Sequence, residues 1–152
     1  MSTATAALRP VSFPKTDVLR RDPAAQAFLI LRLAFAVAPI LFGLDKFAEV
    51  LTDEWEKYLA VEFNDLIPGS AHDAMLMVGV VEIVAGLTVL IAPRFGGLLV
   101  AAWLGGIILS LLLVGGYGDI ALRDFGLLLG ALALSRLASG FAGRREGTRP
   151  IG

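Results

Sequence analysis

The sequence predicts an all-α membrane protein, a bundle of four transmembrane helices with an amphipathic helix in the first outer loop. Of its 152 residues 57% are hydrophobic, and the mean hydropathy is +0.77. Soluble domains are usually about 45–50% apolar, so this excess is too large for an ordinary core. Four apolar stretches each approach the roughly 20 residues that a helix needs to cross a bilayer. Helices are expected because backbone groups cannot stay unpaired in lipid.

The expected spans cover residues 27–47, 74–92, 95–114 and 120–138. Pro93 separates the second span from the third, and Gly115–Gly118 separates the third from the fourth. Such short connections predict antiparallel neighbours. The spans divide the chain into an N-terminal tail over 1–26, a four-helix transmembrane domain over 27–138 and a basic C-terminal tail over 139–152.

The charges outside the spans predict an orientation in the membrane. Basic residues gather in the two tails, at the end of the fourth span and in the second connection: Arg9, Lys15, Arg20, Arg21, Arg94, Arg136, Arg144, Arg145 and Arg149. The loop between the first two spans is acidic. The positive-inside rule therefore places both termini in the cytoplasm and the acidic loop outside, in a multi-pass protein of the cell membrane.

The first outer loop predicts a helix of its own. In KFAEVLTDEWEKYLAVEF the apolar residues recur every three or four positions: Phe47, Leu51, Trp55, Tyr58, Leu59 and Phe63. Acidic residues fill the opposite face, which is typical of a helix lying at the membrane interface. We prefer this interpretation to an unbroken continuation of the first span beyond the membrane.

Composition excludes several classes of function. The formal net charge of -1 gives no electrostatic basis for nucleic-acid binding. The chain has no cysteine, so it can form no disulfide, thiolate metal site or thiol redox centre of its own. Its one histidine, His72, excludes a metal site built from several histidines.

Charged residues within or at the ends of the spans are the candidate functional residues: Arg32, Lys46, Glu82, Asp119, Arg123 and Asp124. Glu82 shares a helix face with Gly79 and Gly86, which favours contact with another helix over contact with lipid. We expect Lys46, Glu82, Arg123 and Asp124 to form one polar cluster in the outer half of the bundle.

We make a separate prediction for each of two arginines, Arg32 and Arg123. Arg32 lies towards the cytoplasmic side, where its side chain can snorkel to a lipid phosphate or meet an acidic residue of a partner. Arg123 follows Asp119 by four residues, a spacing that suits an ion pair on one helix face.

A charge at the bilayer centre costs about 2.5–3.5 kcal/mol on insertion scales, so Glu82 requires an explanation. Three are open. In the first, Glu82 pairs with Arg123 or Lys46 and locks the bundle. In the second, it handles a proton or anchors a ligand. In the third, it contacts another membrane subunit.

Trp103, in the middle of the third span, is interpreted as a packing residue.

Three segments carry a family resemblance. LRLAFAVAPILFGLDKF, with Arg32, Gly43 and Lys46, resembles the first helix of DoxX-family membrane proteins. VEIVAGLTVLIAPRFGG, with Glu82, is similar to the second helix of that family, and YGDIALRDFGLLLGALAL, with Arg123 and Asp124, to its final helix. The resemblance covers about residues 28–138. It implies a small membrane subunit linked to quinone chemistry or to a partner redox enzyme.

Two main hypotheses of function follow. In the first, the chain is a subunit of a quinone-linked membrane redox system, with a quinone bound without a covalent link. Glu82 and Asp124 would be catalytic, and Lys46, Arg123, Arg32 and Asp119 would bind the ligand. In the second, it is a non-catalytic scaffold or anchor, and the charges form a structural ion-pair network. The expected partners are the lipid bilayer and either further copies of the chain or a membrane redox subunit. A transporter is disfavoured because no inverted repeat is visible.

Overall fold

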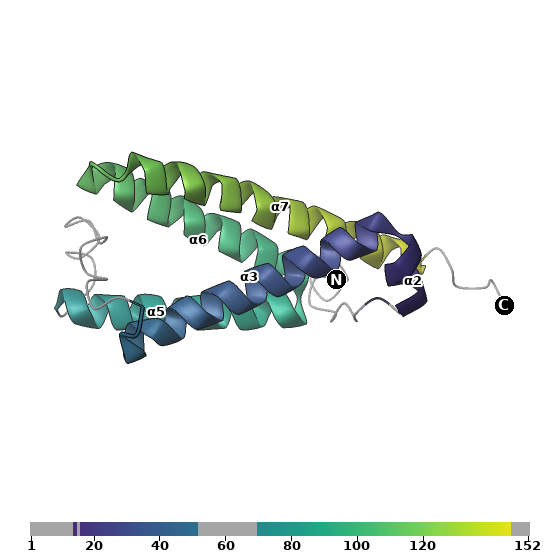
Figure 1. Ribbon diagram of the computed structural model, residues 1–152, viewed down its shortest axis with the longest axis horizontal. Helices are drawn as coiled ribbons and strands as arrows, with labels where there is room; N and C mark the ends of the chain where they lie inside the picture. The colour runs from purple at the N-terminus through teal and green to yellow at the C-terminus, as the bar shows by residue number, and fades with distance from the viewer. Residues whose placement is uncertain (1–13, 15, 52–69, 147–152) are drawn as a thin grey trace, which may run out of the picture.

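The computed structural model describes residues 14, 16–51 and 70–146, and the regular structure in these segments is entirely helical (Figure 1). In chain order the helices are α2 Thr16–Arg21, α3 Pro23–Ala48, α5 Ala71–Ile91, α6 Pro93–Val114 and α7 Gly118–Glu146. The last four are long and apolar enough to cross a membrane. The all-α class is thus confirmed, and so is the presence of four helices with the length and composition of membrane spans.

The helices extend beyond the apolar stretches at both ends of the chain. α3 begins at Pro23, where the side chain of Asp22 accepts a hydrogen bond of 2.9 Å from the Ala24 N–H and caps the first turn. α7 continues to Glu146. Residues 16–26 and 139–146, expected as tails, are therefore largely helical. Hydropathy marks the part of a helix that meets lipid, whereas capping and helix propensity decide where the helix ends.

The first spanning helix has a definite C-terminal end. Glu49 adopts the left-handed conformation, with φ 51°, and its N–H donates to the Asp45 carbonyl over 2.7 Å. The buried Asp45 carboxylate then accepts from the N–H groups of Val50 and Leu51, at 3.0 and 2.8 Å. An unbroken continuation of the first span is therefore wrong. The expected interfacial helix falls mostly on residues 52–69, outside the described segments.

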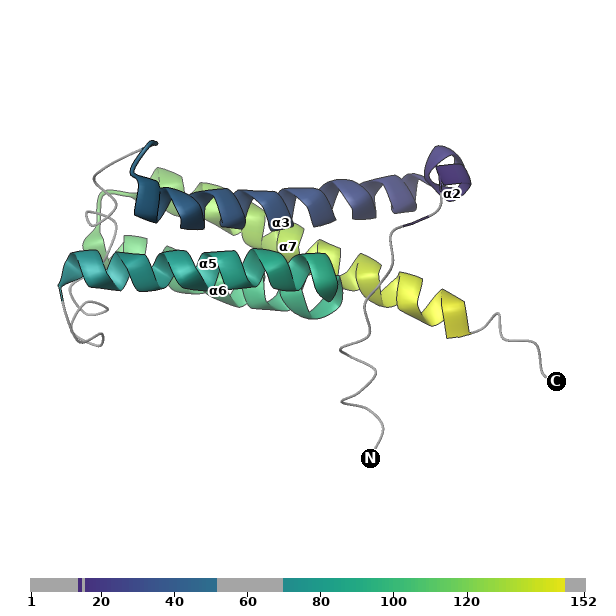
Figure 2. The same cartoon turned by 90° about the horizontal axis from the view of Figure 1, so that it is seen from below.

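The four long helices pack in two close pairs. α3 lies along α5, and α6 lies along α7 (Figures 1 and 2). α5 also packs on α6, and α3 meets α7 where the Phe35 ring lies against Gly130. The main apolar core lies towards the end where α3 begins and α7 finishes: Phe28, Phe35, Ala36, Ala85, Val89, Val100, Ala101, Ala131, Leu134 and Ala138.

Glycines bring α3 and α5 into backbone contact. A Cβ atom on Gly43 would lie 2.5 Å from the carbonyl oxygen of Gly79, and one on Gly86 would lie 2.6 Å from that of Ala36. Small residues at helix crossings allow this approach in membranes, where packing rather than the hydrophobic effect drives association. The contact at Gly43 and Gly79 fixes the next turn of each helix, which carries Lys46 on α3 and Glu82 on α5.

Candidate functional site

A buried ion pair joins α3 to α5. The Lys46 Nζ atom lies 2.7 Å from Glu82 Oε2, and the two side chains are 4% and 11% exposed. It is the one ion pair within 4 Å among the residues that the structure describes. Of the two pairings open to Glu82, the structure therefore has the one with Lys46. The long Lys46 stem reaches inward from the outer end of α3 instead of snorkelling out.

A tryptophan from a third helix completes the site. The Nε1 atom of Trp103, on α6, is buried and has no hydrogen-bond partner in the described part of the chain. The Glu82 carboxylate lies close enough to accept a weak hydrogen bond from this N–H, although the contact falls outside the geometry of a normal hydrogen bond. Leaving a buried donor unsatisfied costs about 1–3 kcal/mol. The Trp103 N–H and the Glu82 carboxylate are therefore a buried donor and a buried acceptor in one cluster, without a hydrogen bond of normal geometry between them.

The position of Trp103 was missed from the sequence, where it was interpreted as a packing residue. A signal was present. Glu82 precedes the turn residue Ala92 by ten positions, and Trp103 follows it by eleven. On two antiparallel helices joined at that turn, both residues lie about 15–16 Å from it, at about 1.5 Å per residue. Equal height on neighbouring helices predicts that they can meet.

Arg32 was expected at the lipid surface, but the structure buries it between helices. Its side chain is 2% exposed, so snorkelling to a lipid phosphate is wrong for this structure. The guanidinium donates to the carbonyl of Leu90, in the last turn of α5, and lies 5.8 Å from the centroid of the Phe28 ring. The last carbonyls of a helix lack intrahelical partners, so Arg32 supplies a donor where α5 needs one.

The charged residues of α7 stand apart from this pair. Asp119 and Arg123 are exposed and Asp124 is half-buried. Among the described residues none of the three forms an ion pair within 4 Å with Lys46 or Glu82, and Asp119 and Arg123 do not pair with each other. The reason is helix order: α5 packs mainly against α3 and α6, while α7 packs mainly against α6. The roles assigned to these three residues stay predictions.

The described residues include no group of three or more His, Cys, Asp or Glu side chains that could hold a metal ion. Comparisons of the chain with protein family models, curated proteins and solved structures find no match. The chemistry of the site therefore follows from its own groups. These are an ammonium, a carboxylate and an indole N–H, brought together from α3, α5 and α6 within the apolar part of the helices.

Proposed function

We propose that this chain is a DoxX-like, four-helix-bundle membrane subunit of a quinone-linked redox system. Its ligand site would be the cluster formed by Lys46, Glu82 and Trp103. One observation carries the proposal: the buried Trp103 N–H, which forms no hydrogen bond of normal geometry in the described part of the chain, beside a buried ion pair. A quinone is an apolar ring that dissolves in the bilayer and carries carbonyl acceptors, to which the Trp103 N–H and the Lys46 ammonium could donate.

Each residue has a distinct task in this proposal. The Trp103 N–H donates to a ligand carbonyl, and the Lys46 ammonium stabilises negative charge on the same side. Glu82 accepts or supplies a proton, because a carboxylate next to a donor can act as general acid or base. A bound quinone takes up two electrons and two protons on reduction to the quinol. The electrons would come from a partner redox subunit in the membrane.

A non-catalytic scaffold is the second candidate, and a specific observation favours it. The Lys46–Glu82 pair and the Arg32–Leu90 hydrogen bond both link α3 to α5. A purely structural network would have this arrangement. The two candidates differ at Trp103: the structural network needs its N–H only to face the Glu82 carboxylate, whereas the redox proposal needs it to donate to a ligand.

Ligand binding at Trp103 separates the two candidates. We expect Trp103→Phe to weaken binding of a short-chain benzoquinone or naphthoquinone by about two- to tenfold in lipid nanodiscs, because one hydrogen bond contributes about 0.5–1.5 kcal/mol. Arg20→Gln, a change at an exposed charge on α2, serves as the control and should bind like the wild type. Equal affinity of wild type and Trp103→Phe, with both variants folded, would exclude the proposed site.

We infer that both termini are cytoplasmic, and a labelling experiment can test this. The chain has no cysteine, so a single introduced thiol reports its side without background. Gly118→Cys, in open space at the start of α7, should react with an impermeant maleimide in intact cells. Thr16→Cys, at the exposed start of α2, should react only after permeabilisation. The reverse pattern would overturn the orientation.

A further inference from the structure

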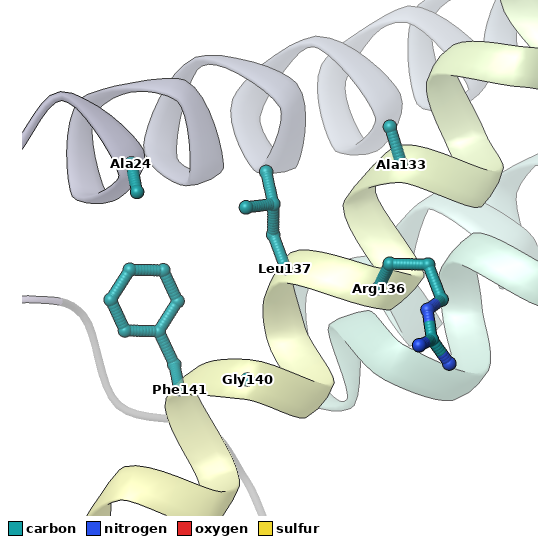
Figure 3. Close-up of a pocket in the computed structure, with 6 residues that line it drawn as sticks. All are labelled: Ala24, Ala133, Arg136, Leu137, Gly140 and Phe141. Atoms are coloured by element: carbon teal, nitrogen blue, oxygen red, sulfur yellow. The ribbon is translucent and has the colours of Figure 1, made fainter.

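An open hollow of about 500 Å³ lies between the start of α3 and the second half of α7, at the opposite end of α3 from Lys46 (Figure 3). Its lining is Ala24, Ala133, Arg136, Leu137, Gly140 and Phe141. Five of these six residues are apolar or glycine, and Arg136 is the only charged one. The hollow is thus an apolar surface with a single cation at its edge.

The walls of the hollow are held in place by contacts with the core. The Phe141 ring packs against the ring of Phe28, with centroids 5.1 Å apart and planes tilted by 46°. Phe28 is 1% exposed. Gly140 faces open space, since a Cβ atom there would meet no atom within 4 Å. The shape therefore comes from packed aromatic rings and from a missing side chain, both fixed by the sequence.

Arg136 lies at the height of the lipid headgroups. It follows Gly118, the first residue of α7, by eighteen positions, or about 27 Å at about 1.5 Å per residue. This length nearly equals the hydrocarbon thickness of about 30 Å. With the start of α7 at one membrane surface, the Arg136 side chain reaches the other surface, while the hollow beside it meets the acyl chains.

The charged residue that lines the hollow, Arg136, is positive. Within the described segments no carboxylate lies within 4 Å of the exposed Arg136 guanidinium. A second exposed arginine, Arg94, lies on the neighbouring helix α6 at the same level. The Ser135 hydroxyl, one residue before Arg136, donates to the Arg94 carbonyl over 2.8 Å. Basic pockets between spanning helices at a membrane surface are suited to anionic headgroups.

From this geometry we propose that the hollow binds one anionic phospholipid of the bilayer leaflet at the α2 end. An acyl chain would lie along Ala24, Leu137 and Phe141, and the phosphate would meet Arg136, with Arg94 contributing attraction. Net negative charge on the lipid is expected because Arg136, which lines the hollow, has no carboxylate within 4 Å in the described segments, and Arg94 adds a second positive charge at the same level. The site is separate from the proposed quinone site and uses none of its residues.

Native mass spectrometry of the full chain, in detergent with added lipid, tests this proposal. Phosphatidylglycerol should bind at least fivefold more tightly than phosphatidylcholine with the same acyl chains. Arg136→Gln should weaken phosphatidylglycerol binding about fivefold, because each arginine near the surface contributes about 1 kcal/mol. Arg136→Lys keeps the charge and should retain most of the affinity. Gly140→Leu should abolish binding by filling the hollow while leaving the charge intact.

The control is Arg20→Gln, which removes an exposed arginine on α2 that does not line the hollow, and it should bind like the wild type. Equal binding of the two lipids, or unchanged binding by folded Arg136→Gln or Gly140→Leu protein, would overturn the proposal. So would displacement of the lipid by millimolar inorganic phosphate, because the site would then be a bare anion site. None of these results bears on the quinone site, so each proposal can fail alone.

Discussion

Replacing Glu82 by Gln, or Lys46 by Met, is expected to lower the free energy of unfolding by about 3–5 kcal/mol. Each change leaves the other charge buried without its partner. The Lys46→Met/Glu82→Gln double variant should recover most of that loss, because no uncompensated charge remains. Unfolding in mixed micelles at increasing denaturing-detergent fraction measures all four free energies, and the double-mutant cycle gives the coupling between the two side chains.

Asp119→Asn supplies the control for this cycle, since the residue is exposed and should change the free energy of unfolding little. Strictly additive effects of the two changes at Lys46 and Glu82 would contradict the buried ion pair. The result also affects any activity test. A variant at Glu82 that loses function must first be shown to keep its fold.

Substituting Gly43 by Ala is expected to separate α3 from α5. The new Cβ would lie 2.5 Å from the Gly79 carbonyl oxygen, closer than real Cβ contacts, and that atom belongs to the backbone. Overpacking of this kind typically costs about 1–3 kcal/mol. Because Lys46 and Glu82 each lie one turn beyond the contact, the ion pair should weaken together with the packing. The same detergent titration measures the loss.

A matched glycine makes this prediction specific. A Cβ atom added to Gly126, within α7, would meet no atom within 4 Å. Gly126→Ala should therefore be neutral or should stabilise by up to about 1 kcal/mol, the difference in helix propensity. If Gly43→Ala were as stable as Gly126→Ala, the close contact between α3 and α5 would not exist in solution.

The fold was largely predictable because lipid imposes simple rules. Apolar length located the four spanning helices, and Pro93 and Gly115 marked the two short connections. Helix ends were less predictable. The Asp22 cap starts α3 before the apolar run, and the left-handed Glu49 ends it, held by the hydrogen bond to Asp45. These ends depend on individual hydrogen bonds, which hydropathy does not record.

The site was predictable only in part. The sequence singled out Lys46 and Glu82 because charges are expensive in an apolar span. It could not choose between Lys46 and Arg123 as partner, since that choice depends on which helices are neighbours. Trp103 has a largely apolar side chain in an apolar span. The sequence therefore favoured a packing role, although the indole carries one N–H donor. Arg32 was expected at the lipid surface because nothing in the sequence places the Leu90 carbonyl beside it.

The most direct test of the central claim is native mass spectrometry of the protein extracted gently from its own membrane, with Trp103→Phe in parallel. The account predicts that the wild type retains a quinone, distinguished by mass from any phospholipid, and that Trp103→Phe loses it. A wild-type protein that carries phospholipid and no quinone would contradict the account. The Lys46–Glu82 pair would then be a structural link between α3 and α5.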